Sequence, residues 1–410
     1  MEYNARKIFA KFCVQEVPDS MKRYVSYMIE GVLGAVLNCA NMLAVYTKLS
    51  ITHAATIVNV YSGLVGIMPI VMAFLLDNCL GTYWMLFLSS VTYSIGLSFL
   101  AMSIPPVLSK VTDTCSAYEP ACIGHIQSIL FYVALALIAV VINMDEMQRR
   151  SCHNSTISFD RGTPQRLRFV GARGEDETRV TLRIIPMWMT FIVCGIVISI
   201  GNTYFLEQAN DMNNKLGSLH VPVVFLFLYY SMLKWGNDQS FENLMIKTSA
   251  AVLASSPIFY SIICCIIAAL VEAKRLHVVK KYGLIDKPED TIPMSMFWLL
   301  PQLFFLAFME YSAGKIFVMF CVQEVPDSMK RYVPYMTEGV LGAGTIGSVL
   351  LVYIVNKVSK RGGRLSWFQD TLNRSRLDNY YWVLTVLSSI NYVVNFFLLS
   401  WFKIRRIRPR

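Results

Sequence analysis

The fold is decided by residues 292–322, which read IPMSMFWLLPQLFFLAFMEYSAGKIFVMFCV. This stretch is long enough to cross a bilayer as a helix, which takes about 20 apolar residues. One acid, Glu310, lies well inside it, and we expect it to be the only acid so far inside any apolar segment of the chain. A charge at membrane depth costs about 2.5–3.5 kcal/mol on insertion scales, so such residues usually face a bundle interior or a water-filled path. We therefore expect Glu310 to be functional. The alternative is a carboxylate kept neutral, or paired with Lys315, for packing alone.

The composition indicates that the whole chain, and not only residues 292–322, is a membrane protein. Of its 410 residues, 55% are hydrophobic and 16% are charged, whereas soluble proteins average about 25% charged residues. Because backbone polar groups in lipid must be paired within the protein, and the alternation typical of membrane strands is missing from the sequence, we predict an all-α, polytopic membrane helical bundle of about ten transmembrane helices. The ten apolar segments are 31–48, 54–76, 82–104, 126–144, 184–205, 219–234, 249–271, 292–316, 338–356 and 379–402.

The net charge of +10 does not indicate a nucleic-acid partner. The basic residues lie in short loops and in the C-terminal tail 404–410, where they are expected to anchor helix ends and bind anionic lipid. The polar stretch 145–183 contains eight arginines, which favours a cytosolic linker. The expected partner of these basic residues is therefore the lipid bilayer.

Enzyme chemistry has no support in the sequence. The five histidines are scattered, and a phosphate-binding glycine loop or a zinc-protease motif is missing. The ten cysteines show no metal spacing, so we expect no metal and no cofactor. Cys115 and Cys122 flank the polar loop CSAYEPAC, and spacing alone leaves open whether they form a disulfide.

One internal repeat stands out. Residues 7–36 and 315–344 are identical at twenty-five of thirty positions. Fold symmetry does not require identical loop residues, so we interpret residues 1–30 as a duplicated N-terminal extension.

Several motifs resemble the plant nitrate/peptide transporter family, which belongs to the proton-dependent oligopeptide transporter group of the major facilitator superfamily. Residues 291–312, which contain Glu310, resemble its tenth helix. The other similar stretches are ATIVNVYSG (55–63), FLLDNCLGTYW (74–84), IIPMWMTFIVCGIV (184–197), FLEQANDMNNKLGSLHVP (205–222), ALVEAKRL (269–276), QEVPDSMK (323–330) and WFQDTLNRSRLDNYYW (367–382).

The resemblance implies twelve helices in two halves that rock around a central site. This chain supplies about ten, so we expect an incomplete N-terminal half of four helices at 31–144 and a C-terminal half of six helices at 184–403. By this resemblance, the two helices without a counterpart in the chain are the family's fifth and sixth, and the signature of the fifth helix is absent with them. The resemblance also places the 357–376 loop outside, so the glycosylation triplet at Asn373 is expected to be an acceptor.

The family's activity is proton-coupled symport of nitrate, small peptides or other small solutes by alternating access, with protons as the coupling ion. Glu310 matches the family's tenth-helix carboxylate. Desolvation favours the neutral form of a carboxylate, so we expect Glu310 to exchange a proton. The family's first-helix Glu-x-x-Glu-Arg pattern is absent: the positions three and four residues after Glu30, where the pattern requires Glu and Arg, hold Leu33 and Gly34. In the loop between the second and third helices, Thr82 stands where the family has an arginine.

Other polar residues are candidates for the transport path. Asp77, at a helix end before Gly81, is a candidate for a cytosolic gate with basic residues, and the alternative is a single boundary charge that anchors the helix end. The alternative for the others is ordinary hydrogen bonding between helices. The residues expected to line a substrate cavity are Asn59, Tyr61, Asn202, Tyr311 and Asn395.

Two functional hypotheses follow. The first is a multi-pass transporter in the plasma membrane or the vacuolar membrane. The alternative is a truncated family member, or a faulty gene model, with no coupled activity.

Overall fold

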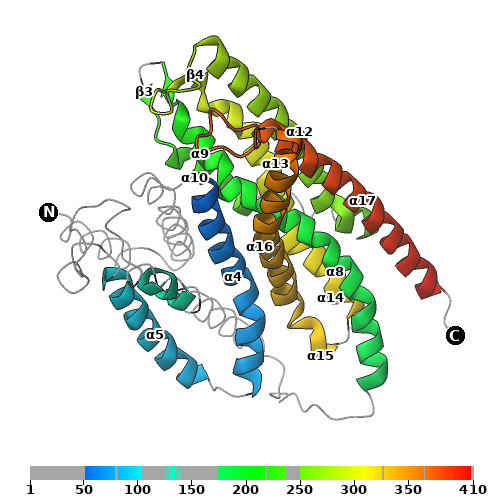
Figure 1. Cartoon of the computed structure of the whole chain (residues 1–410). Coiled ribbons are helices and arrows are strands. Elements are labelled where there is room, and N and C mark those ends of the chain that lie inside the picture. The colour runs from blue at the N-terminus through cyan, green and yellow to red at the C-terminus, as the bar shows by residue number, and fades with distance from the viewer. Residues whose placement is uncertain are drawn as a thin grey trace.

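The structure is a computed structural model that describes residues 51–78, 82–102, 126, 129–134, 136–138, 140, 174–217, 219–236, 250–325, 327–363 and 365–407. Most of these residues lie in long helices (Figure 1). Among the described residues, six helical segments are long and apolar enough to span a membrane: Ala55–Phe74, Ile184–Asp211, Ser255–Lys281, Met296–Val322, Val333–Ser359 and Leu377–Trp401. The predicted all-α membrane bundle is thus confirmed.

The helices follow the order of the predicted apolar segments. The first two described helices are α4 (Ile51–Asn78) and α5 (Thr82–Met102). The C-terminal part contains α8 (Gly174–Asn202), α9 (Tyr204–Asp211), α10 (Val224–Gly236), α12 (Ala250–Lys281), α13 (Leu300–Tyr311), α14 (Val318–Glu324), α15 (Asp327–Lys330), α16 (Val333–Ser359) and α17 (Leu377–Ile407). Three short helical turns complete it: the 3₁₀ turns η2 (Met296–Leu299) and η4 (Arg361–Gly363), and the π-helical turn η3 (Ser312–Phe317).

Four short strands tie loops together at one end of the bundle. β1 (Met212–Asn213) pairs in parallel with β4 (Ile292–Ser295), which joins the end of α9 to the segment that leads into α13. β2 (Lys215–Leu216) and β3 (Leu219–His220) form an antiparallel hairpin. These loops therefore hold α9 and α13 close to each other.

The hydrophobic core of the C-terminal half draws buried side chains from all six of its apolar helical segments. Within it, α12 packs against α13 and α17, and α10 packs against α13. Such a shared core makes this half one packed unit.

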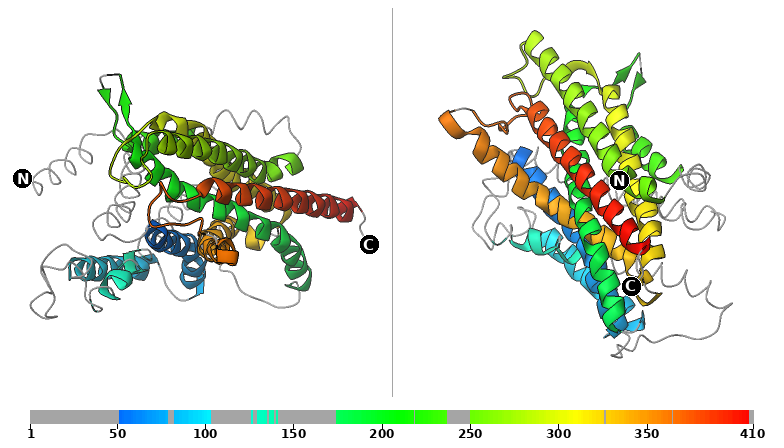
Figure 2. Two further views of the ribbon diagram at one scale, coloured as in Figure 1. Left: turned by 45° about the horizontal axis from the view of Figure 1, so that its top comes forward. Right: turned by 90° about the vertical axis from the view of Figure 1, so that its right-hand side faces the viewer.

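Helix α16 lies between α4 and α8 (Figure 1; Figure 2). Glycine allows the close approach: a Cβ atom on Gly342 would lie 2.6 Å from the carbonyl oxygen of Gly63 and 2.9 Å from the Cα atom of Gly66. Small residues let membrane helices pack closely and gain dispersion contacts. This seam joins the N-terminal part to the C-terminal half.

A glycine also ends α12. Gly283 has a φ of 66°, and the amide of Leu284 donates to the carbonyl of Val279 at 2.9 Å while the amide of Gly283 donates to Lys280 at 3.2 Å. This is the Schellman pattern of a helix C-terminus. It turns the chain back over the end of α12, where the candidate network described below is buried.

Several predicted boundaries differ from the structure. Helix α8 begins at Gly174, inside the predicted linker 145–183, and α17 continues to Ile407, inside the predicted tail 404–410. The segment 219–234 forms a strand and then the short helix α10. The extension 1–30, the segment 31–48 and the pair Cys115 and Cys122 lie outside the described residues.

Candidate functional site

Glu310 lies where two helices of the C-terminal half, α13 and α10, meet. Glu310, near the end of α13, forms an ion pair with Lys234 of α10, and its side chain is 13% exposed. The hydroxyl of Tyr230 hydrogen-bonds the same carboxylate. Tyr230 and Lys234 are four residues apart, so they share one face of α10. The carboxylate therefore has a cation and a phenol as partners, and the partner found is Lys234 and not the expected Lys315.

The helix changes its winding directly after this acid. Residues Ser312–Phe317 form a π-helical turn between α13 and α14. Single π-helical turns inside α-helices are rare and often occur at functional sites. The hydroxyl of Ser312 donates to the carbonyl of Phe308 at 2.6 Å, and Tyr311 packs with Phe308 and Ile316. The turn marks the point where α13 departs most from a regular helix.

A cavity of about 40 Å³ lies beside the ion pair, between α8, α9, α10 and α13. One water needs roughly 10–15 Å³ of such volume, so this conformation has room for roughly three waters. Tyr230 belongs to both the cavity wall and the Glu310 cluster. The wall also includes Asn202, Phe205, Leu206, Ala209, Leu226, Leu303 and Leu306.

The predicted cavity residues do not come together as a group. Asn202 lines this cavity. Asn395 is fully buried and its amide donates to the hydroxyl of Thr190 at 2.9 Å, which is ordinary bonding between α17 and α8. In α4, Asn59 is 3% exposed, and the buried side-chain oxygens of Asn59 and Tyr61 have no hydrogen-bond partner among the described residues.

The remaining predicted residues are placed less informatively. Tyr311 is buried in the cluster at the π-helical turn. Asp77 falls in the last turn of α4, and its side chain lies outside the described residues.

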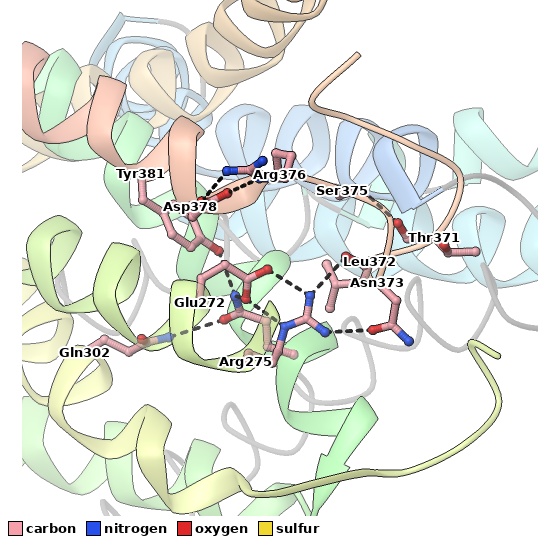
Figure 3. A network of polar contacts seen from close by, with 11 residues as sticks. Glu272, Arg275, Gln302, Thr371, Leu372, Asn373, Ser375, Arg376, Asp378 and Tyr381 are labelled. Carbon is pink, nitrogen blue, oxygen red and sulfur yellow. Dashed lines mark hydrogen bonds and ion pairs between the residues drawn. The ribbon is translucent and has the colours of Figure 1, made fainter. Parts of the chain in front are cut away.

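A second buried ion pair was missed by the sequence analysis. Glu272 and Arg275 of α12 are both fully buried. The guanidinium grips both carboxylate oxygens, with Nε to Oε2 at 2.7 Å and Nη2 to Oε1 at 2.8 Å (Figure 3). Glu272 lies within the candidate span Ser255–Lys281. The expectation that Glu310 is the only acid inside an apolar span is therefore wrong.

This pair is the centre of a larger network (Figure 3). Arg275 also donates to the side-chain oxygen of Asn373 at 2.9 Å and to the carbonyl of Leu372 at 3.0 Å. The Gln208 amide of α9 donates to Glu272 at 2.6 Å and to the Tyr381 hydroxyl at 3.3 Å. Buried charges are tolerated when paired and fully hydrogen-bonded, and this pair meets that condition.

The network also corrects the glycosylation hypothesis. Asn373 is 5% exposed. Its oxygen accepts from Arg275, and its nitrogen donates to the carbonyl of Leu284 at 3.1 Å. A sugar attached to the Nδ2 atom does not fit at this buried, packed position, so the folded protein does not offer this amide as an acceptor.

Comparison with known proteins agrees with this architecture. A family model described as the POT family, PTR2, matches residues 171–368, which contain the Glu310 site and the Glu272–Arg275 pair. This region is similar to the POT family domain. The chain is 28% identical to Protein NRT1/ PTR FAMILY 5.5 of Arabidopsis thaliana over 476 aligned residues, covering 85% of the chain and 90% of the relative. It is 30% identical to Protein NRT1/ PTR FAMILY 5.12, covering 53% of the chain but 41% of that relative.

The first of these alignments is longer than the chain itself, which has 410 residues. NRT1/ PTR FAMILY 5.5 therefore carries internal residues that have no counterpart here. The second relative is spanned by the chain over less than half of its length.

Solved structures of POT transporters share the fold. The POT family transporter PepTSo has a TM-score of 0.59 at 10% identity, with 92% of this chain and 96% of that chain covered. A POT family transporter in complex with 5-aminolevulinic acid has a TM-score of 0.54 at 12% identity, with 90% and 93% covered. Such low identities show a common fold and nothing further about the site.

Proposed function

We propose that this chain is a proton-coupled secondary transporter of small solutes, in the class of nitrate, small peptides and similar compounds, working by alternating access. The observation that carries the proposal is the ion pair between Glu310 and Lys234, placed between α13 and α10 and linked to the cavity by Tyr230. The names of the NRT1/PTR relatives and the POT fold support the same activity. No covalent chemistry is part of this proposal.

The ion pair explains how a proton can control solute binding. When Glu310 is ionised, its charge is balanced by Lys234. When Glu310 takes up a proton, the Lys234 ammonium loses its counter-ion in surroundings where charges are poorly screened, and an anionic group of the solute then becomes its best partner. Because coupling between two ligands is reciprocal, a solute that engages Lys234 also favours protonation of Glu310. Proton and solute therefore bind together.

The resting geometry fits a closed, unloaded state. The cavity beside Tyr230 holds roughly three waters, which is too little for a dipeptide. Solute entry must therefore part α10 from α13, which are joined by the Glu310 ion pair. Protonation weakens that connection, so the same event that frees Lys234 also permits the cavity to widen.

The test is uptake into liposomes under an imposed pH gradient. Coupling free energies of this kind are typically worth about 5–150-fold, so we expect Glu310→Gln to lower gradient-driven uptake of nitrate or a dipeptide by about tenfold or more. Lys234→Met is expected to raise the KM for an anionic solute. Glu289→Gln and Lys357→Met make the same substitutions at exposed positions and serve as controls.

The outcome separates the hypotheses cleanly. Wild-type protein that is inserted and folded but takes up no solute under any gradient contradicts the proposal and favours the non-transporting alternative. Undiminished gradient dependence in Glu310→Gln contradicts the role of this acid. As a further part of the proposal, we place the protein in the plasma membrane or the vacuolar membrane, and a fluorescent fusion imaged in plant cells tests this.

A further inference from the structure

We propose that the buried Glu272–Arg275 pair is a positioning device for the cavity: it fixes the wall on α9 and, through a weaker second link, holds the facing wall on α13, and thereby sets the affinity for solute. The inference rests on the proposed transport function for its kinetic consequence, and on geometry alone for its structural one. Both residues lie outside the cavity wall, so they act through other side chains.

The first connection runs to α9. Gln208 is 1% exposed, and its amide nitrogen donates to the Oε2 atom of Glu272 at 2.6 Å. The next residue along α9, Ala209, is part of the cavity wall, together with Leu206 one turn before it. A hydrogen bond to a charged group is worth more than a neutral one, at about 1.5–3 kcal/mol. Glu272 therefore fixes the rotation and height of α9.

The second connection runs to α13. The amide nitrogen of Gln302 donates to the side-chain oxygen of Gln208 at 3.4 Å. Leu303 follows it and lines the cavity, and Leu306 does so one turn later. Glu310 lies eight residues beyond Gln302 on the same run of helix, which is about 12 Å at 1.5 Å per residue. The network thus reaches the helix that carries the proton-binding group.

This second link is the weaker one. Its length is at the limit of a hydrogen bond, and the other polar atom of the Gln302 side chain, Oε1, is buried without a partner in the part of the chain that the structure describes. A small shift of α13 away from α9 therefore breaks little, whereas the Gln208–Glu272 bond stays closed. The cavity has one rigidly held wall and one wall that is able to move.

The anchor itself is held from outside the bundle. Besides pairing with Glu272, the guanidinium of Arg275 donates hydrogen bonds to the carbonyl of Leu372 and to the side-chain oxygen of Asn373, in the loop between α16 and α17 (Figure 3). Bidentate pairing of a guanidinium with a carboxylate fixes both distance and orientation. Because both carboxylate oxygens of Glu272 accept hydrogen bonds from Arg275, the carboxylate is held in one orientation, and Gln208 donates to it in that orientation. The pair is built for geometry, since buried ion pairs often add little stability compared with apolar residues of the same size.

The test compares variants in the network with a matched variant at an exposed ion pair. Gln302→Met removes the link to α13 without touching a charge, and Glu272→Gln keeps the shape of the carboxylate but removes its charge. The matched control for Glu272→Gln is Asp286→Asn, since Asp286 pairs with Arg374 at 2.6 Å and is 73% exposed.

Two readouts are measured on the full chain. The first is the KM and kcat of uptake in liposomes. The second needs no transport: Leu206→Cys is placed in the cavity wall, and its rate of reaction with a hydrophilic maleimide is followed by peptide mass spectrometry, which separates it from the ten native cysteines. Both network variants are expected to raise KM about fivefold while kcat changes less than about twofold. We also expect them to change the labelling rate of the cysteine by about threefold, as the wall moves.

A purely structural role predicts something different. Network variants that melt at a lower temperature but keep the wild-type KM and labelling rate would overturn the proposal, and so would a control that shifts KM equally. If Glu272→Gln does not fold, Gln302→Met decides the matter alone, because it leaves the ion pair in place. If wild-type protein takes up no solute, the proposed function fails, and the labelling rate still decides whether the pair positions the wall.

Discussion

Replacing Gly342 of α16 by valine is expected to destabilise the protein by about 2 kcal/mol, because this glycine lets α16 touch the backbone of α4. A Cβ atom at Gly342 would lie 2.6 Å from the Gly63 oxygen and 2.9 Å from the Gly66 Cα atom. Both neighbours are backbone atoms, so no side chain is able to rotate away. The two helices must separate by about 1 Å to restore normal contact, and overpacking of this kind costs about 1–3 kcal/mol.

The same helix supplies a matched control. A Cβ atom on Gly347 would meet nothing within 4 Å. Gly347→Val therefore makes the identical change of residue, five positions further along α16, without a clash. We expect it to alter stability by no more than about 0.5 kcal/mol, as at an ordinary surface position.

The assay is unfolding of the purified protein in mixed micelles, titrated with a denaturing detergent and followed by tryptophan fluorescence. The reasoning predicts an earlier midpoint for Gly342→Val and an almost unchanged midpoint for Gly347→Val. An equal loss of stability in both variants would mean that valine destabilises α16 at any position, and not through a clash with α4. An unchanged midpoint at Gly342 would mean that α4 does not pack on α16 in this way.

Three further outcomes follow from buried polar groups. Arg275→Met alone is expected to cost about 3–5 kcal/mol because it leaves Glu272 buried and unpaired, whereas adding Glu272→Leu should recover most of that loss in the same unfolding assay. Asn373 should carry no sugar when the protein is made in plant cells, so treatment with an endoglycosidase should leave its peptide mass unchanged. Thr190→Val removes the hydroxyl that accepts from Asn395 and should cost about 0.6 kcal/mol, the average measured for hydrogen bonds between membrane helices, and no more than about 1.7 kcal/mol, the largest value measured.

The helices of the C-terminal half could be predicted because bilayer thickness imposes the length of each apolar segment. The predicted segment 379–402 falls inside α17, and all but the first residue of the predicted segment 249–271 fall inside α12. Both helices extend beyond these segments, and in α12 the polar residues past the apolar segment are covered by the loop that carries Leu372 and Asn373. The sequence around α12 therefore indicated where the apolar part ends, and the helix itself runs on to Lys281.

The Glu310 site was half predicted. An acid inside an apolar run is visible in the sequence, and in the structure Glu310 lies in a polar cluster with Lys234. Its partner Lys234 is the last residue of an apolar segment, where a lysine normally anchors a helix end at the interface. Nothing in the order of residues distinguishes that role from an ion pair, because the pairing depends on how α10 packs against α13.

The Glu272–Arg275 ion pair is indicated in the sequence by the spacing of its two residues. Glu272 and Arg275 are three residues apart, a spacing that puts opposite charges side by side on a helix. The sequence does not reveal that the loop carrying Asn373 folds over them and excludes water. A pair exposed at the helix end and a pair buried beneath a loop have the same spacing, so the distinction required the tertiary structure.

The central claim is that Glu310 carries the proton that moves with the solute. The most direct measurement starts with liposomes at equal pH on both sides, adds solute outside, and follows the internal pH with an enclosed dye. Wild-type protein is predicted to acidify the interior as solute enters, and Glu310→Gln is predicted to leave the internal pH constant. Acidification by Glu310→Gln at the wild-type rate would contradict the account.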